Sequence, residues 1–308
     1  MTKKIAILIP CYNEGKSVSS VVGSFRKQLP DADIYVYDNN SSDNTYQEAV
    51  NAGAIVRRET RQGKGNVIRS MFKQIEADVY VMVDGDGTYP AERVHELIQP
   101  VIDDRADMTI GSRLHRLSAS RFKVLNWLGN KAFLFVLNTI FKMNVTDLLS
   151  GYRAFSRHLV KSLPVLSRGF EVETELTVKC FERGHRIVEI PVNLVPRQQG
   201  SESKISIIRD GVLILSTIFS LFRDYKPLTV FGSFGLVLMF CGAVPGYLVV
   251  WGHDAAVRIP LLLLSGGFVL SGLISIFVGL ILHSISRHFK EQDYLLENLL
   301  LKDARDRR

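Results

Sequence analysis

The first 112 residues alternate short apolar runs with amphipathic stretches. The runs are rich in β-branched residues, as strands are, and the stretches between them repeat apolar residues at helical spacing. The predicted strands are residues 4–10, 33–38, 54–58, 78–84 and 107–112, and the predicted helices lie near residues 16–28, 43–52, 64–76 and 91–103. This alternation predicts an α/β domain with a mostly parallel sheet covered by helices.

Two long uncharged runs follow near the C-terminus, at residues 228–250 and 259–282. Each is long enough to cross about 30 Å of hydrocarbon as a helix. A pair of buried core helices is the alternative, but the short connection WGHDAAVR favours a two-helix transmembrane hairpin. The outer flanks carry Arg223, Lys226, Arg287 and Lys290, and the connection has only Arg258. This bias predicts that both chain ends are cytoplasmic.

Amphipathic segments surround the hairpin and complete the predicted organisation. Residues 117–143 mix large apolar residues with Arg and Lys, which is typical of a helix in the membrane interface, although packing on the sheet is the alternative. Residues 204–227 form a predicted juxtamembrane helix, and residues 283–308 a short tail helix with a leucine stripe. The predicted domains are therefore a cytoplasmic domain over residues 1–203, the juxtamembrane helix, the hairpin and the cytoplasmic tail.

Small residues recur every fourth position in both uncharged runs. They are Gly242 and Gly246 in the first, and Gly267, Ser271, Ser275 and Gly279 in the second. Such ridges let membrane helices approach closely. The pattern is compatible with packing inside the hairpin and with packing in an oligomer.

Charge and cysteine content narrow the choice of partners. The net charge of +7 suits a protein at an anionic lipid surface, and no basic, aromatic-studded motif indicates nucleic acid binding. Three scattered cysteines predict neither a disulfide framework nor a zinc site.

Polar clusters follow three of the predicted strands, at CYNEG, DNNSSD and DGDGT. Ligands of such sheets collect beyond the carboxyl ends of the strands, so the clusters predict one crevice. In DGDGT, Asp84 and Asp86 repel each other unless a cation lies beside them. Oxygen ligands favour Mg²⁺ or Mn²⁺, and Gly85 and Gly87 leave room for a diphosphate. A solvated acidic pair is the alternative.

The other clusters have the groups that a nucleotide needs. Pro10, Tyr12, Asn13 and Glu14 offer an aromatic face and hydrogen-bonding groups for a base and ribose, and Asp38 can accept hydrogen bonds from either. Turn formation and helix capping also favour Asn and Asp, so a structural role is the alternative. Lys64, in RQGKGN, is a candidate diphosphate contact at a helix start, because this segment lacks the full phosphate-loop spacing.

These motifs occur together in an order that resembles family 2 glycosyltransferases of the GT-A fold. The matching segments are IPCYNEG, the Asp38 cluster, RQGKGN, DGDGTYP, IGSR and TDLLSGYRAF. They are most similar to those of the polyprenyl-phosphate glycosyltransferases, which include dolichyl-phosphate mannose synthases and GtrB-like enzymes. The resemblance covers about residues 4–205 and extends to the hairpin. It implies a GT-A, Rossmann-like domain followed by the two-helix transmembrane hairpin.

The resemblance also implies roles for individual residues. Asp84, Gly85 and Asp86 are expected to engage the nucleotide sugar, with Asp86 the more direct ligand of a metal shared with Asp84. Asp147 resembles an acidic residue near the reacting centre, with Ser150 and Arg153 supporting its loop. The acceptor phosphate is expected to meet Arg113, Arg121, Arg153, Arg197 and Lys204. The implied catalytic set is Asp147, Arg113 and Asp86.

One position departs from the pattern of many relatives, which have DADLQ or DVDLQ where this chain has DGDGT. Thr88 replaces the Gln that can complete metal coordination, which leaves the third protein ligand open. Glu171, Glu173 and Glu175 alternate in GFEVETEL, where a solvated helix start is the simplest reading. Glu173 is the one predicted to face the crevice.

The implied activity is an inverting, metal-dependent transfer of a hexose from UDP-glucose or another UDP-hexose to undecaprenyl phosphate. It would take place at the cytoplasmic face of the inner membrane, in O-antigen or cell-envelope glycan modification. A homotetramer is implied by resemblance, and a flippase and a downstream transferase are candidate partners. The alternatives are a processive polysaccharide synthase, which typically has a QxxRW motif and more spans than this chain, and a non-catalytic membrane scaffold.

Overall fold

A computed structural model describes residues 3–113, 134–135, 137–139, 141–196, 207–250 and 255–306. The chain divides into two compact units, Met1–Ile218 and Phe219–Arg308. The boundary falls within one helix, α8 (Ile207–Tyr225), which occupies most of the predicted juxtamembrane segment. Most of the predicted interfacial helix at residues 117–143 lies outside the described residues.

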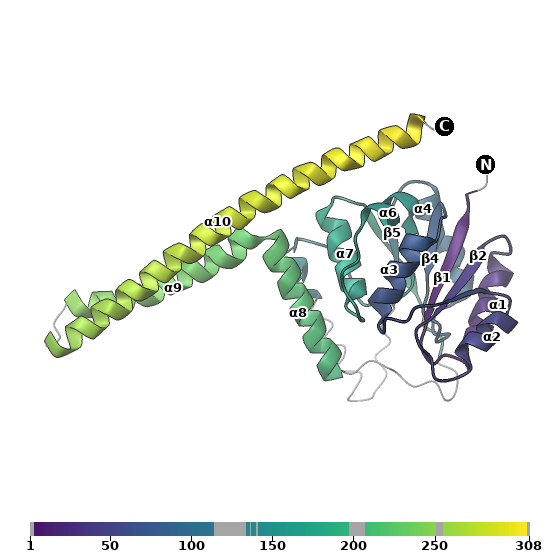
Figure 1. Ribbon diagram of the computed structural model, residues 1–308, viewed down its shortest axis with the longest axis horizontal. Helices are drawn as coiled ribbons and strands as arrows, with labels where there is room; N and C mark the ends of the chain where they lie inside the picture. The colour runs from purple at the N-terminus through teal and green to yellow at the C-terminus, as the bar shows by residue number, and fades with distance from the viewer. Residues whose placement is uncertain are drawn as a thin grey trace. The chain divides into compact units, whose positions relative to one another are not determined.

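The first unit is built on a mixed, mostly parallel sheet (Figure 1). Its seven strands have the order β3-β2-β1-β4-β6-β5-β7, and only β6 is antiparallel to its neighbours, β4 and β5. The strands are β1 (Ile5–Cys11), β2 (Asp33–Asp38), β3 (Ile55–Arg58), β4 (Val79–Met82), β5 (Met108–Arg113), β6 (Arg153–Ser156) and β7 (Ile187–Val192). The α/β prediction is confirmed, with the first five strands close to their expected positions.

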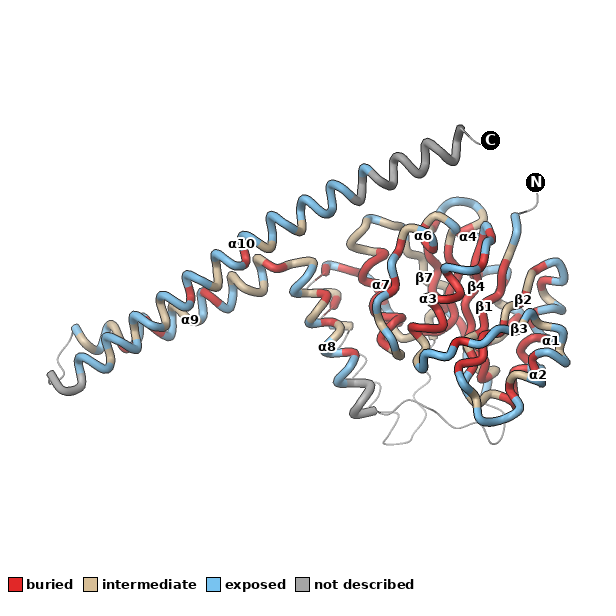
Figure 2. Tube along the Cα trace, in the orientation of Figure 1, coloured by how far each residue is buried: buried red, intermediate tan, exposed pale blue. Residues whose placement is uncertain are grey.

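Helices cover both faces of this sheet. They are α1 (Val18–Gln28), α2 (Thr45–Asn51), α3 (Lys64–Gln74), α4 (Val94–Ile102) after the short helix η1 (Ala91–Arg93), α6 (Arg157–Ser162) and α7 (Val172–Glu182). Ile7 and Ile9 of β1 share a buried core with residues of α1 and α4. On the other face, Phe72 of α3 contacts the rings of Tyr80 and Phe155 edge-on. Both faces of the central strands are therefore buried, as Figure 2 shows for β1 and β4.

The antiparallel strand β6 decides where one loop of the site lies. Its first residue, Arg153, pairs with Met82 at the end of β4 and with Ile110 of β5. The segment that leads into β6, residues 145–152, is thereby brought to the carboxyl ends of the parallel strands. A four-residue strand with the sequence RAFS has too little pattern to predict.

The second unit contains α9 (Pro227–Val250) and α10 (Ala255–Asp306). Both helices are long and apolar enough to cross a membrane. Most of the residues of these helices whose burial is described are exposed (Figure 2), as expected for helices that face lipid. The prediction of a separate short tail helix is wrong, because α10 continues without a break from the second apolar run into the tail.

Small residues hold α9 and α10 close together. A Cβ atom on Gly235 would lie 2.6 Å from the carbonyl oxygen of Gly272, and one on Gly272 would lie 2.6 Å from that of Gly235. Ser275 Oγ donates a hydrogen bond of 2.8 Å to the Phe231 carbonyl, and Ser265 Oγ donates one of 2.7 Å to that of Gly242. Ser275 of the predicted ridge thus packs inside the hairpin, whereas Gly267 does not contact α9.

Gly272 and Gly267 give a matched test of this packing, because a Cβ on Gly267 would meet no atom within 4 Å. We expect Gly272→Val to weaken the hairpin by about 1–3 kcal/mol through overpacking and Gly267→Val to have little effect. Thermal unfolding of the detergent-purified variants measures the difference. Equal melting temperatures for the two variants would contradict the packing described here.

Candidate functional site

The loops after β1 and β2 are fastened to each other at the carboxyl edge of the sheet. Asn13 adopts a left-handed backbone conformation with φ of 52°. Its backbone N–H donates to Ser41 Oγ at 2.9 Å, while its side-chain Oδ1 accepts from the backbone N–H of Ser42 at 2.7 Å. The Glu14 amide donates to Thr45 Oγ1 at 2.8 Å. These bonds bring together the segments that contain Tyr12, Asn13, Glu14 and Asp38, as predicted from the strand ends.

Asp38 lies at the end of β2 and is almost fully buried. Its Oδ1 accepts from the Ser41 amide at 3.2 Å, and its Oδ2 lies 3.8 Å from Arg58 Nε. Tyr12 is 41% exposed, and Pro10 of β1 is half-buried. Contacts of these residues with a base and ribose remain predictions.

Asn39 organises the next loop, a role that its sequence position did not reveal. Its Nδ2 donates to the carbonyls of Glu59 and Arg61 at 2.8 and 2.9 Å, and its Oδ1 accepts from the Gly63 amide at 2.7 Å. The Glu59 carboxylate accepts from the Arg61 guanidinium at 2.9 Å and from Ser70 Oγ. These hydrogen bonds fix the turn from which α3 begins.

Glycines let the start of α3 lie against the segment before α7. A Cβ on Gly63 or Gly65 would collide with the carbonyl oxygens of Arg168 or Ser167, and the Gly65 amide donates to the Arg168 carbonyl at 3.0 Å. Gly63, with φ of 123°, also has a backbone conformation that favours glycine. The position of Lys64 is therefore fixed by backbone contacts on both sides.

Glutamates of α7 hold that facing segment. Glu171 Oε1 accepts from the amides of Arg168 and Gly169 at 3.1 and 3.0 Å. Glu175 accepts from the Ser167 amide at 2.8 Å and pairs with Lys179 at 2.6 Å. Both glutamates are buried, as Glu173 is, so the reading of a solvated helix start is wrong.

Lys64 bridges two carboxylates in the crevice. Its Nζ lies 2.5 Å from Asp84 Oδ1 and 2.5 Å from Glu173 Oε1. Burial alone would lower the pKa of Lys64, but the two carboxylates outweigh it and hold the pKa above its ordinary value. Lys64 is therefore a protonated, positively charged group beside Asp84, and Glu173 of α7 lies against it.

The acidic pair has the donor chemistry of a divalent cation site. Asp86 is buried, and its Oδ1 accepts from the amide and hydroxyl of Thr88 at 3.0 and 2.7 Å. Thr88 thus orients the carboxylate of Asp86. Asp84 lies against Gly151, where a Cβ would overlap the carboxylate. Within the described residues no group of three or more His, Cys, Asp or Glu side chains is placed to hold a metal, so an ion here would need further oxygens from its ligand.

Arg113 and Asp147 form a bidentate ion pair at the end of β5. Arg113 Nε and Nη2 lie 2.6 and 2.8 Å from Oδ2 and Oδ1 of Asp147, and the Arg113 amide donates to Oδ2 at 3.0 Å. Burial would raise the pKa of Asp147, but Arg113 outweighs it and keeps the pKa below its ordinary value. Glu189 of β7 accepts from the amides of Thr146 and Asp147 at 2.9 and 3.1 Å and so anchors the loop. Asp147 is therefore an ionised carboxylate that orients Arg113.

Of the two roles expected for Arg153, support of the Asp147 loop and contact with an acceptor phosphate, its burial favours the first. The side chain is fully buried, and its guanidinium donates to the carbonyls of Leu148 and Ser150 at 2.7 and 2.8 Å and to Thr177 Oγ1 at 2.7 Å. Arg153 therefore supports the loop that presents Asp147, together with Ser150, whose Oγ donates to the Gly111 carbonyl at 2.6 Å. The other predicted phosphate contacts, Arg121, Arg197 and Lys204, lie outside the described residues.

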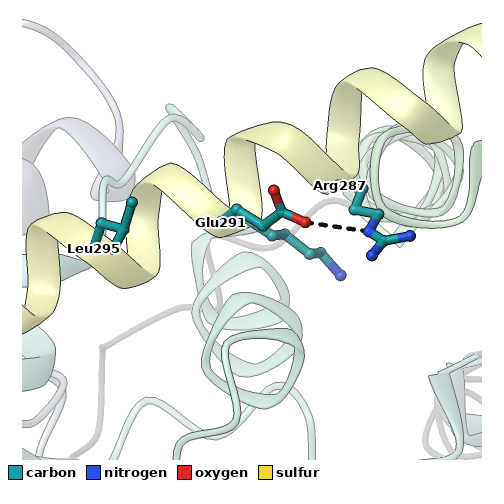
Figure 3. A pocket seen from close by; sticks show the side chains of 4 residues that line it. Arg287, Glu291 and Leu295 are labelled. Atoms are coloured by element: carbon teal, nitrogen blue, oxygen red, sulfur yellow. Dashed lines mark hydrogen bonds and ion pairs between the residues drawn. The ribbon is translucent and has the colours of Figure 1, made fainter.

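A separate hollow lies along α10 in the second unit (Figure 3). It is lined by Arg287, Lys290, Glu291 and Leu295, and Arg287 Nε lies 3.2 Å from Glu291 Oε1. None of these residues belongs to the predicted site. The crevice at the sheet edge remains the candidate functional site.

Comparisons with known proteins identify a family and relatives of this sequence. Residues 6–163 match the model of glycosyl transferase family 2. The chain is 34% identical over 236 residues to glycosyltransferase AglJ of Haloferax volcanii, covering 75% of this chain and 76% of that protein. It is 29% identical to undecaprenyl-phosphate mannosyltransferase of Micrococcus luteus, covering 66% of this chain and 88% of that one.

A solved structure shares the fold of the first unit. Glucosyl-3-phosphoglycerate synthase of Mycobacterium tuberculosis, crystallised with Mn²⁺, UDP-glucose and phosphoglyceric acid, superposes with a TM-score of 0.61 at 22% identity. The match covers 71% of this chain and 80% of that chain. It shows that the sheet and its helices have the GT-A arrangement predicted from the motifs.

Glu59 gives a pH-dependent test of the turn before α3. Its contacts with Arg61 and Ser70 lower its pKa from 4.5 to about 2. A carboxylate with a lowered folded-state pKa stabilises the fold above pH 4.5 and loses that contribution as the pH falls toward 2. We expect Glu59→Gln to lower the free energy of unfolding at neutral pH and to have progressively less effect below pH 4.5. Urea unfolding across this range measures it, and a deficit independent of pH would contradict the assignment.

Proposed function

The chain belongs to glycosyl transferase family 2, and we propose that it transfers a hexose from UDP-glucose or another UDP-hexose to a polyprenyl phosphate, with inversion at the anomeric carbon. One observation carries the proposal. An acidic pair, the cation Lys64 and the oriented guanidinium of Arg113 lie at one edge of a GT-A sheet, in a chain with two helices able to cross a membrane. The name of the Micrococcus relative supports the acceptor, and the ligands of the Mycobacterium structure support the donor.

The chemistry of the acceptor defines what the protein must supply. A phosphate monoester has a second pKa of about 6, by analogy with phosphorylated side chains, so it is largely dianionic at neutral pH. Its oxygen attacks the anomeric carbon while the bond from that carbon to the nucleoside diphosphate oxygen breaks. No strong general base is needed. The protein must instead hold two anions together and stabilise the departing diphosphate.

Arg113 and Asp147 suit the first of these tasks. We assign Arg113 to the acceptor phosphate, because a guanidinium presents a planar set of donors to phosphate oxygens. Asp147 accepts two of its N–H groups and fixes the plane of the guanidinium. With its pKa held below the ordinary value, Asp147 is a poor base, so its role is to orient Arg113.

Asp84, Asp86 and Lys64 suit the second task. Asp84 and Asp86 would hold Mg²⁺ or Mn²⁺ together with diphosphate oxygens, which would supply the ligands that the described residues lack. The ion would neutralise the charge that develops on the leaving group. Asp86, oriented by Thr88, is assigned as the more direct ligand, and Lys64 is assigned to the diphosphate.

The remaining assignments concern place and partners. The basic residues that flank the apolar helices place the catalytic unit and both termini at the cytoplasmic face of the inner membrane in this proposal. Undecaprenyl phosphate is the proposed lipid. The protein is proposed to form a homotetramer, with a flippase and a downstream transferase as its partners.

A single assay tests the activity. Purified protein is incubated with radiolabelled UDP-hexoses, polyprenyl phosphate and Mg²⁺ or Mn²⁺, and the labelled lipid is separated and sized. We expect a lipid that carries a single sugar. Long polymer would favour a processive synthase, and the absence of transfer from every donor would favour a scaffold.

The acidic pair is tested by Asp86→Asn, which keeps the oxygen that accepts from Thr88 but removes the charge. We expect transfer to fall by on the order of a hundredfold, because a metal ligand at the leaving group is lost. Asp103→Asn, at an exposed position, is the matched control. An unchanged rate in Asp86→Asn at saturating metal would refute the metal assignment.

The Arg113 assignment is tested by Arg113→Lys, which keeps the charge but loses the bidentate geometry. We expect the KM for polyprenyl phosphate to rise about tenfold, equivalent to about 1.4 kcal/mol, with the KM for the sugar nucleotide unchanged. Arg186→Lys, in an exposed ion pair with Asp107, is the control. A rise confined to the sugar-nucleotide KM would contradict the assignment.

A further inference from the structure

The buried ammonium of Lys64 is the most unusual charge in the crevice. Its side chain is 10% exposed, and that of its partner Glu173 is 4% exposed. The ring of Phe170 lies 6.0 Å from Nζ and covers it further. Its other partner, Asp84, is 29% exposed and belongs to the acidic pair assigned to the metal. Lys64 Nζ is therefore paired on one side with the buried carboxylate of Glu173 and on the other with the partly exposed carboxylate of Asp84, which is assigned to the metal.

Local structure does not account for a lysine at this position. Lys64 is the first residue of α3, where the helix dipole disfavours a positive charge. Taking an ammonium out of water is also costly unless carboxylates compensate it. Gly63 and Gly65 already fix the backbone without help from the side chain. The position of the ammonium is thus explained by the carboxylates and not by the helix.

Glu173 is committed to Lys64. Its Oε1 is paired with Nζ, and its Oε2 is buried and has no hydrogen-bond partner within the described residues. A buried carboxylate with an unsatisfied oxygen depends on the nearby cation for its stability. If Lys64 moved far away, Glu173 would lose its contact ion pair and would depend on the longer-range charge of Arg153.

We propose that Lys64 is an exchangeable internal cation. It neutralises Asp84 until metal and nucleotide bind. It then leaves Asp84 and keeps its contact with Glu173. Lys64 then competes with the metal for Asp84 in the absence of nucleotide. Glu173 acts through Lys64 and is a positioning residue. The inference rests on the proposed function for the identity of the metal and the diphosphate.

This exchange makes binding of the metal and of the nucleotide cooperative. A diphosphate that attracts Lys64 frees an oxygen of Asp84, so nucleotide strengthens metal binding beyond what direct coordination gives. The coupling is reciprocal, because linkage requires the metal to strengthen nucleotide binding by the same factor. Removal of the internal cation should weaken this coupling while it strengthens metal binding alone.

The test uses the full chain in detergent, with Mn²⁺ affinity read from the electron paramagnetic resonance of free Mn²⁺, with and without UDP. The variant is Lys64→Met with Glu173→Gln, which removes both charges and leaves no unpaired buried carboxylate. We expect the Kd for Mn²⁺ without UDP to fall about tenfold, equivalent to about 1.4 kcal/mol. The factor by which UDP strengthens Mn²⁺ binding should be smaller in this variant than in the unaltered chain.

The matched control is Lys161→Met with Glu76→Gln, which removes a Lys–Glu ion pair beyond the C-terminal end of α3. We expect its Mn²⁺ affinity to equal that of the unaltered chain. Lys64→Arg, which keeps the charge, should retain the strengthening by UDP.

An unchanged or weakened Mn²⁺ affinity in the Lys64→Met, Glu173→Gln variant without UDP would overturn the exchange. An equal gain in Mn²⁺ affinity in that variant and in the control would also overturn the exchange. Failure of the proposed function is a separate result, since it appears as an absence of labelled lipid with the unaltered chain.

Discussion

The pairing of buried carboxylates with fixed cations is the constraint on which the candidate site depends. Asp84 and Glu173 share Lys64, and Asp147 has Arg113, at the carboxyl edge of one sheet. Glu173 and Asp147 are not stable there as isolated charges, because burial removes the water that solvates them. The same cations are the groups that a diphosphate and a phosphate monoester would bind. In the proposed function, the interactions that keep the ligand-free site stable would thus also prepare it for two anionic substrates.

The fold serves this pairing through backbone contacts more than through side-chain packing. The antiparallel direction of β6 brings the Asp147 loop beside the ends of β4 and β5, and Glu189 fastens that loop through its amides. Glycines at the start of α3 let Lys64 approach the segment before α7. Small shifts in these segments would separate the charges, and glutamates that accept from backbone amides oppose such shifts in both.

Periodicity and turn residues predicted the first five strands and the position of the crevice, because parallel strands with buried faces have a strong apolar pattern. The ion pairs of Lys64 with Glu173 and of Arg113 with Asp147 could not be predicted from the sequence, because each joins residues that are distant along the chain. Arg153 shows the limit most clearly. Its motif suggested a phosphate contact, but only the structure reveals that it is fully buried against carbonyl groups. In α7, alternate glutamates suggested solvent exposure, whereas their carboxylates hold buried amides.

The central claim is that the crevice binds a metal and a nucleotide by exchange of cations on Asp84. An experimental structure of the chain with Mn²⁺ and UDP, with the ion identified by anomalous scattering, tests it most directly. The account predicts Mn²⁺ against Asp84 and Asp86, with Lys64 moved onto the diphosphate and still in contact with Glu173. Mn²⁺ and UDP bound elsewhere, or Lys64 still on Asp84 with both ligands present, would contradict it.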